Sequence, residues 1–324
     1  MDAAAKPRRR RRTVSGYKVK SKALKWIWAV LRTVLLIGLA YIILYPVLVK
    51  LSVGLMSRSD MNDMTVHWVP KNPSLDNFKE VLRLIDYGEY FFTTLFTTVA
   101  TTLLQVAACT FAGYGFARFH FKGRKFLFFL AILTLVVPQQ AYSVSSYTMF
   151  RNFDFFGIGG LFGWDMGSLL NTPWPAMILA IGCQGTKNGL LIYIMRNFFQ
   201  NLPKEVEESA WVDGAGVFRT FTRIMLPNTV PALTTITVFS FVWSWNDLYF
   251  ASTYAPNMKL MPLILNQLSW QIQQILGRSN VDVIQISMLT NAAALLILLP
   301  LLIFFLIVQR FFIEGVERTG LTGM

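Results

Sequence analysis

The chain has 324 residues, of which 54% are hydrophobic and 15% are charged, and its mean hydropathy is +0.47. Several apolar blocks reach the roughly 20 residues that a helix needs to cross a bilayer, so the composition excludes an ordinary soluble domain and indicates an integral membrane protein. The formal charge of +13 is concentrated at the N-terminus, where residues 1–25 hold ten Lys or Arg and one Asp.

The basic segment 1–25 directly precedes the first apolar block. Basic residues beside a membrane span mark its cytoplasmic side and contact anionic lipid head groups, so membrane lipid is an expected partner. A nucleic-acid-binding arm is the alternative for such a run, but its position favours a topology determinant, and no nucleic acid is expected as a partner. The following block, 26–55, is too long for a cleavable signal peptide and predicts a retained first helix.

Six membrane spans are predicted, and their even number places both termini on one side. Lys and Arg gather in the two tails, the 115–125 loop and the 197–228 segment, which the positive-inside rule assigns to the cytoplasm. The expected fold is an all-α integral membrane protein. Its spans lie at about 27–52, 91–114, 126–150, 174–196, 229–252 and 289–309. Its parts are a basic tail (1–25), the first helix with an outer loop (26–90), a five-helix core (91–310) and a cytoplasmic tail (311–324).

Two local patterns refine this outline. In the outer loop 56–90, the sequence NPSLDNFKEVLRLI places apolar side chains at helical spacing between charged ones, which predicts an amphipathic surface helix. The third span contains PQQ at 138–140, and the fourth contains QGTKNG at 184–189. Pro and Gly interrupt helices, and polar groups at membrane depth generally face a bundle interior or a water-filled path. These two spans are therefore expected to line a pathway.

Motifs for catalysis are missing from the sequence. It contains no Gly-Lys dipeptide, which excludes a GxxxxGK[ST] phosphate-binding loop, and no G-x-S-x-G elbow. Its two histidines, His67 and His120, are 53 residues apart in loops assigned to opposite sides of the membrane, which excludes a His-based metal site. The predicted spans offer only Asp247 for an intramembrane aspartyl pair. We therefore expect no enzymatic activity, metal or cofactor in this chain.

The cytoplasmic segment 197–228 mixes charges with helix breakers in the run LPKEVEESAWVDGAGVFRTFTRIMLP. The first proline suits the start of a helix, and the glutamates after it complement the helix dipole. That helix is expected to end at Gly214 or Gly216, because glycine adopts left-handed backbone angles easily. A second short helix, 217–225, is expected to stop before the Leu-Pro pair. The result is a compact projection whose small residues allow another protein's backbone to approach closely.

This projection resembles the cytoplasmic signature of permease subunits of binding-protein-dependent ABC transporters, which reads Glu-Ala-Ala, three residues, Gly and then Leu-Pro. Here it reads Glu208, Ser209, Ala210, Gly214 and, after eleven residues, the Leu-Pro pair ending at Pro227. Ser209 replaces the first Ala, a change of one small residue for another. The runs NFFQNLPKEVEESAWVDGAG, VWSWNDLYF and QRFFIEGVERTGLTG resemble the carbohydrate-uptake branch, which includes the smaller permease of the maltose transporter.

The resemblance implies a type I ABC importer permease fold in the bacterial plasma membrane, with coupling helices at 201–227 that dock on a cytoplasmic ATPase. Two ATPase subunits would bind ATP and Mg, while a second permease subunit and an extracytoplasmic solute-binding protein complete the importer. The coupling residues that the resemblance implies are Glu207, Glu208, Ser209, Ala210, Asp213, Gly214, Ala215 and Pro227.

A sugar path calls for amides and carboxylates that bind hydroxyls and for aromatic faces that contact sugar rings. The candidates are Gln139, Gln140, Tyr142, Trp243, Trp245, Asn246 and Asp247. Interfacial anchoring is the alternative for the tryptophans, and interhelical hydrogen bonding is the alternative for the glutamines. A non-sugar solute, a six-span channel and a secondary transporter are the alternative functions, of which the last two do not need the 208–227 signature. The sequence leaves open which sugar is carried, whether this chain contacts it, and whether the partner permease is a different chain.

Overall fold

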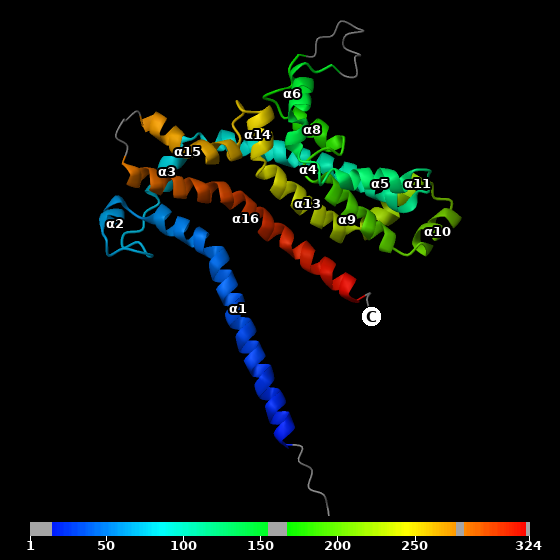
Figure 1. The fold of residues 1–324 in the computed structure, drawn as a ribbon, viewed down its shortest axis with the longest axis horizontal. Coiled ribbons are helices and arrows are strands. Elements are labelled where there is room, and N and C mark those ends of the chain that lie inside the picture. The colour runs from blue at the N-terminus through cyan, green and yellow to red at the C-terminus, as the bar shows by residue number, and fades with distance from the viewer. Residues whose placement is uncertain (1–14, 155–166, 277–281, 322–324) are drawn as a thin grey trace, which may run out of the picture.

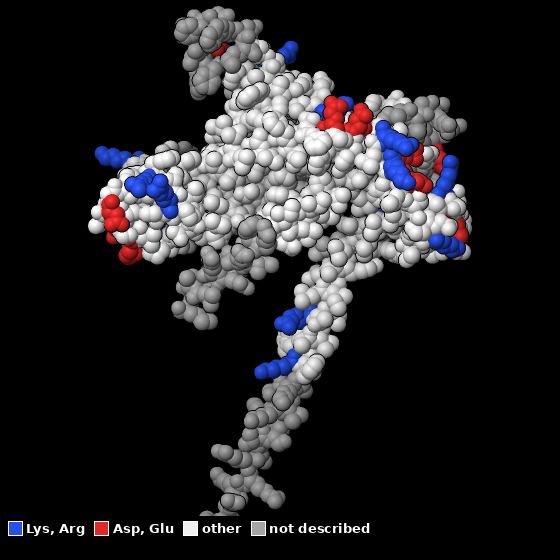
Figure 2. Space-filling view, turned by 180° about the vertical axis from the view of Figure 1, so that it is seen from behind, with Lys and Arg blue, Asp and Glu red and all other residues white. Residues whose placement is uncertain are grey.

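The computed structural model describes residues 15–154, 167–276 and 282–321, and every regular element within these ranges is a helix. This confirms the predicted all-α fold. The helices form an elongated bundle with α10 (Glu205–Val212) at one end and α15 (Met261–Leu276) at the other (Figure 1). Charged side chains gather at these two ends and are sparse over the broad middle (Figure 2). This distribution is typical of a bundle that crosses a bilayer, because charges are costly at membrane depth. Following the positive-inside rule, we call the α10 end cytoplasmic and the α15 end outer.

Three long helices match the first, second and sixth predicted spans. They are α1 (Ser15–Leu55), α4 (Tyr87–Arg118) and α16 (Val283–Leu321). Each contains a stretch that is long and apolar enough to cross a membrane. Both α1 and α16 extend beyond the predicted spans, so residues 15–25 and 311–321 of the predicted tails are helical. Residues 1–14 and 322–324 of those tails lie outside the described ranges.

The other three predicted spans are each divided into shorter helices. The third consists of α5 (Arg124–Leu133), the 3-10 turn η1 (Gln139–Tyr142) and α6 (Ser143–Arg151). The fourth consists of α8 (Trp174–Ile181) and α9 (Asn188–Asn201), and the fifth of α13 (Val230–Trp245) and α14 (Leu248–Tyr254). The first two breaks fall where the sequence places Pro and Gly, as expected. The break in the fifth span contains neither and was not predicted. There the carboxylate of Asp247 accepts the backbone N–H of Phe250 at 2.8 Å and starts a new helix.

The outer end contains the predicted amphipathic helix, α3 (Asp76–Leu84). Its apolar face buries Val81, which belongs to one hydrophobic cluster with Leu289 and Ala292 of α16. The buried amide of Asn77 donates to the backbone carbonyls of Gly54 and Met56, both at 2.9 Å, and so ties α3 to the end of α1. The short helix α2 (Arg58–Asn62) lies in the same outer loop.

The centre of the bundle is α4, which packs against α8, α9 and α13. Its contact with α9 requires a glycine. A Cβ atom added to Gly113 would lie 2.5 Å from the Cβ atom of Met195 and 3.0 Å from the backbone nitrogen of Arg196. The contact between α9 and α5 is equally close, because a Cβ atom on Gly189 would lie 2.4 Å from the carbonyl oxygen of Ala131. These two glycines allow the helices to approach closely, as small residues do between membrane helices.

Helix α1 packs against α3 and α16 only near its C-terminal end and then leaves the bundle (Figure 1). It contains Pro46, which removes one backbone hydrogen bond at this point. From Leu24 to Pro46 nearly all side chains are exposed, including Trp28 and Ile42. Most of the first span therefore packs against none of the other described helices.

Candidate functional site

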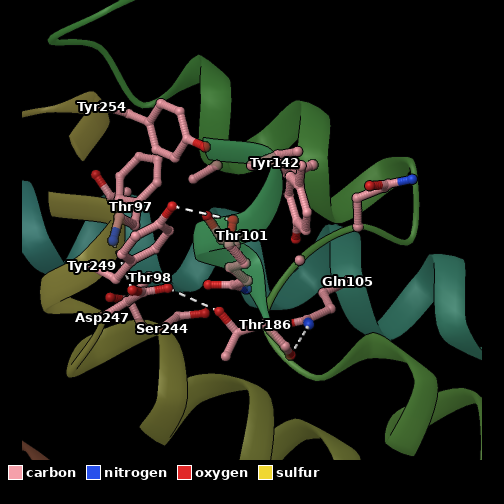
Figure 3. Close-up of a pocket in the computed structure, with 16 residues that line it drawn as sticks. Thr97, Thr98, Thr101, Gln105, Tyr142, Thr186, Ser244, Asp247, Tyr249 and Tyr254 are labelled. Carbon is pink, nitrogen blue, oxygen red and sulfur yellow. Dashed lines mark hydrogen bonds between the residues drawn. The ribbon is translucent and has the colours of Figure 1, made fainter. Parts of the chain in front are cut away.

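Polar side chains from α4 and from all three helix breaks meet in one cavity (Figure 3). The cavity has a volume of about 50 Å³, which is room for a few water molecules. Typical small-molecule sites occupy about 300–1,000 Å³. The polar residues that line it are Thr97, Thr98, Thr101, Gln105, Gln139, Tyr142, Gln184, Thr186, Ser244, Asp247, Tyr249 and Tyr254.

The break in the fourth span separates this cavity from a larger groove of about 410 Å³. Both spaces are lined by η1 and by residues 184–186. The groove is further lined by α5, the segment 134–138 and Lys187. The short stretch 184–186 therefore forms a thin wall that has polar groups on both sides.

Gln105 holds this wall in place. It is 1% exposed, and its amide nitrogen donates to the backbone carbonyl of Thr186 at 2.9 Å and to the side-chain oxygen of Asn188. Its amide oxygen accepts the hydroxyl of Ser240 on α13. One side chain of α4 thus joins the fourth span to the fifth.

Asp247 holds the same wall from the opposite side. One carboxylate oxygen accepts the hydroxyl of Thr186 at 2.8 Å, and the other caps α14 through the backbone N–H of Phe250. Both oxygens of this carboxylate are therefore bound within the protein. Thr186 is fixed through its carbonyl by Gln105 and through its hydroxyl by Asp247.

Two tyrosines of α14 connect the breaks of the third and fifth spans. Tyr249 donates to the backbone carbonyl of Gln139 at 3.3 Å, and the hydroxyls of Tyr254 and Ser146 are 2.7 Å apart. Through these bonds, all three breaks belong to one connected set of hydrogen bonds.

The predicted path residues divide into three groups. Gln139, Tyr142 and Asp247 line the cavity. Gln140 and Asn246 are exposed and line neither the cavity nor the groove. The two tryptophans also lie outside both spaces. Trp245 is 1% exposed and packs edge-on against Phe91, since it lies on the buried face of α13, while Trp243 lies beneath the ammonium group of Lys187.

Several cavity residues were missed from the sequence, above all Gln105 and the threonines of α4. The sequence signal that could have identified them is the spacing of polar residues along this span. Thr94, Thr98, Thr101 and Gln105 recur every three or four residues in an otherwise apolar span, which is typical of one polar helix face. All four are buried. Such a stripe at membrane depth predicts a face turned toward the bundle interior.

The cytoplasmic projection begins with α10, which ends as the sequence predicts. Gly214 has a φ of +77°, the N–H of Gly214 bonds to the carbonyl of Trp211 at 3.0 Å, and the N–H of Ala215 bonds to that of Ala210 at 2.9 Å. These two bonds make a Schellman motif, for which glycine is the preferred residue. The chain then reverses into α11 (Val217–Thr220).

The second helix of the projection is longer than predicted. α11 continues through the π turn η3 (Phe221–Met225) into α12 (Leu226–Asn228), so the prediction that it stops before Leu226 and Pro227 is wrong. Proline fits here because it lies in the first turn of α12, where its missing N–H is tolerated. The path bends by 80° between the end of α12 and the start of α13.

Neighbouring glutamates of α10 lie in opposite environments. Glu207 is buried, lies 3.4 Å from the Nε atom of Arg118, and accepts the hydroxyl of Tyr114 at 2.5 Å. Arg118 also donates to the backbone carbonyl of Leu202 at 2.8 Å. These contacts attach the projection to the end of α4. Glu208, the first residue of the signature, is exposed.

The exposed surface of the projection contains large apolar side chains among charged ones. Trp211, Val212 and Phe218 are 51%, 87% and 70% exposed. Ser209, Asp213 and Gly214 are exposed beside them, whereas Ala210 is buried and Ala215 is half-buried. A clustered apolar surface with a polar rim marks a protein interaction site. Pro227 lies outside this surface, within α12.

Comparison with known proteins identifies the family. The model for the binding-protein-dependent transport system inner membrane component matches residues 105–318. The chain is 32% identical over 289 residues to the osmoprotective compounds uptake permease protein GgtD of Synechocystis sp., covering 87% of this chain and 88% of the relative. It is 32% identical over 256 residues to the alpha-glucoside transport system permease protein AglG of Rhizobium meliloti, covering 78% of this chain and 62% of the relative.

A solved structure shows the same fold. It is a bacterial ABC transporter involved in the import of the acidic polysaccharide alginate, with a TM-score of 0.66 and 21% identity over 88% of this chain and 96% of that chain. The family match covers most of the residues that line the polar cavity, the cytoplasmic projection and four of the six predicted spans, and it favours an importer permease over an ion channel or a secondary transporter. This chain belongs to the family of inner-membrane components of binding-protein-dependent transport systems.

Proposed function

We propose that this chain forms half of the translocation path of a carbohydrate importer in the bacterial plasma membrane. A second permease subunit forms the other half. Two cytoplasmic ATPase subunits supply the energy by binding and hydrolysing ATP with Mg, and an external solute-binding protein delivers the sugar. The observation that carries the proposal is the projection, whose exposed Glu208 and apolar surface are held rigidly to α4 by the buried contacts of Glu207.

Rigidity is what a coupling element needs. Glu207 and Arg118 fix α10 to α4, and the Schellman motif at Gly214 fixes the turn to α11. A displacement of an ATPase bound at Trp211 and Phe218 is then passed to α4 and, through α12, to α13. Both helices line the polar cavity. The projection is therefore positioned to convert closure of the ATPases into movement of the helix breaks.

The cavity of about 50 Å³ is too small for a saccharide, so passage requires the three breaks to separate. Alternating access supplies this separation. A shift from mostly closed to mostly open requires several kcal/mol of differential binding energy. In this proposal ATP bound to the partner subunits provides that energy, and the hydrogen bonds of Gln105, Asp247 and Tyr249 rearrange.

A carbohydrate substrate is supported by two observations. The cavity and the groove present amides, hydroxyls and tyrosines, which match the hydroxyl groups of sugars. The relative AglG is named for alpha-glucoside transport. An ABC permease for a non-sugar solute is the second candidate, since the relative GgtD is named for osmoprotective compounds.

The test compares two exposed glutamates of the same helix. The complete transporter is reconstituted in liposomes with Glu208→Ala or, as the matched control, Glu205→Ala, and oligosaccharide uptake and sugar-stimulated ATP hydrolysis are measured. We expect Glu208→Ala to lower both activities about tenfold or more while assembly is retained, because a charge-assisted contact is lost at the docking surface. Glu205→Ala should have little effect. Equal activities of the two variants would show that residues 207–227 do not couple transport to ATP hydrolysis.

A further inference from the structure

Lys187 occupies an unusual position for a cation. It precedes α9 in the break of the fourth span, and its φ of +55° places a non-glycine residue in the left-handed region. Such backbone conformations cost free energy and persist where the surroundings enforce them, often at functional sites. A charge at membrane depth is likewise costly and is usually functional. Both observations indicate that this ammonium group has a functional role.

The preceding residue explains how Lys187 is held. Thr186 is bound by Gln105 through its carbonyl and by Asp247 through its hydroxyl, and both contacts lie on the cavity side of the wall. The side chain of Lys187 lies on the other side, where it lines the groove of about 410 Å³ and is exposed. The hydrogen bonds of Thr186 thus lie on the cavity side of residues 184–186, and the ammonium group of Lys187 lies on the groove side.

Among the described residues, the ammonium group has an aromatic contact and no counter-ion. Its Nζ atom lies 4.6 Å from the centroid of the Trp243 ring, and Trp243 stacks on Phe239 with ring centroids 5.2 Å apart. Within the described ranges, no carboxylate forms a salt bridge with Lys187. Asp247 is the acidic residue of the fifth span, and its two carboxylate oxygens accept hydrogen bonds from Thr186 and Phe250. The positive charge of Lys187 is therefore available to a molecule in the groove.

The groove has an apolar side formed by α5 and residues 135–138 and a polar side that can bind the hydroxyl groups of a sugar. The groove is also lined by Gln184, three residues before Lys187, and by Gln139 and Tyr142 of η1. These side chains offer hydrogen-bonding groups to a ligand. We propose that Lys187 is a specificity-determining residue that favours saccharides carrying a carboxylate, such as uronic-acid oligosaccharides. The carboxylate binds the ammonium group and the ring hydroxyls bind the glutamines. This inference rests on the proposed carbohydrate function.

The test compares two substrates that differ only in charge. Uptake of an oligouronide and of its uncharged carboxyl methyl ester is measured in liposomes that contain the complete transporter and its binding protein. The quantity of interest is the ratio of kcat/KM for the acid to that for the ester. Each variant is compared with wild type using the same binding protein, so the preference of that protein cancels.

We expect Lys187→Gln to lower this ratio about tenfold or more, because one charge-assisted hydrogen bond is lost. Lys187→Arg should keep the ratio within about threefold, since it keeps the charge. Lys122→Gln, which removes an exposed cation from the cytoplasmic loop, is the matched control and should leave the ratio unchanged. An unchanged ratio in Lys187→Gln, or an equal loss of uptake for both substrates, would overturn the inference and leave carbohydrate import intact. Failure of the wild type to import either substrate or any neutral oligosaccharide would instead contradict the carbohydrate function itself.

Discussion

Replacing Glu207 by Gln removes one charge from a buried ion pair without changing the size of the side chain. The side chains of Glu207 and Arg118 are 6% and 8% exposed, so the guanidinium group of Arg118 would be left buried without a counter-ion. Breaking such a pair costs about 3–5 kcal/mol. Arg118 keeps its bond to the carbonyl of Leu202, and Gln can still accept the hydroxyl of Tyr114, so we expect the lower value of about 3 kcal/mol. This energy corresponds to an increase of about 100-fold in the population in which the projection is detached from α4.

Limited proteolysis of the assembled transporter measures this population, because cleavage follows the open fraction when opening and closing are fast. The cleavage rate within residues 202–216 should rise about 100-fold in Glu207→Gln. The matched variant Glu208→Gln, one residue further along the same helix, should stay within about twofold of wild type, as surface substitutions usually do. Equal cleavage rates in the two variants would refute the assignment of Glu207 as the buried anchor.

Three further predictions concern other parts of the molecule. Gly113→Ala should destabilise the protein by about 2 kcal/mol or more, because its Cβ atom would lie 2.5 Å from Met195, whereas Gly115→Ala meets no atom within 4 Å and should not lower the melting temperature. Gln105→Leu leaves partners on α9 and α13 without their hydrogen bonds, and should lower both the melting temperature and uptake through a loss of about 1–3 kcal/mol. In the outer loop, the hydrogen bond from Lys71 and those from Thr65 hold the pKa of Asp63 below its ordinary value of 3.8. Because the folded-state pKa is lowered, this contribution is fully present above pH 3.8 and is lost as the pH falls through the folded-state pKa. The ratio of the pepsin cleavage rate of the loop in Asp63→Asn to that in wild type, measured at each pH so that the activity of pepsin cancels, should therefore exceed 1 at pH 4 and approach 1 as the pH falls.

The sequence is sufficient to predict the parts of the fold that depend on local chemistry. Apolar length identifies α1, α4 and α16, and the Pro and Gly residues mark the breaks in the third and fourth spans. Gly214 or Gly216 is predicted to end α10 because glycine adopts left-handed backbone angles easily, and in the structure Gly214 has this conformation. The break at Asn246 was missed because Asn and Asp near a span end are also common without a break. Only the bond from Phe250 to Asp247 distinguishes the two cases.

Burial inside the bundle is what the sequence does not reveal. Glu207 and Glu208 are adjacent and identical in type, yet one is buried because it faces Arg118 at the end of a helix 89 residues earlier in the chain. Trp243 and Trp245 are similarly close, but they lie on different faces of α13. The spacing of Gln105 with the threonines of α4 indicates an inward face, but its partners Thr186 and Ser240 can be identified only in the assembled bundle. These differences arise from tertiary contacts that local patterns do not encode.

The sparse packing of α1 has a consequence for how the chain is made. Among the described helices, α1 is synthesised before its principal partner α16, which begins more than 200 residues later. Contacts between such distant segments form late, because a long loop must close before they contribute. The first span therefore lies in the bilayer as a single helix until α16 has been synthesised and can pack against it. Its surface must be compatible with lipid throughout that interval, which accounts for the Leu, Ile and Val side chains on all sides of the helix between Arg32 and Lys50.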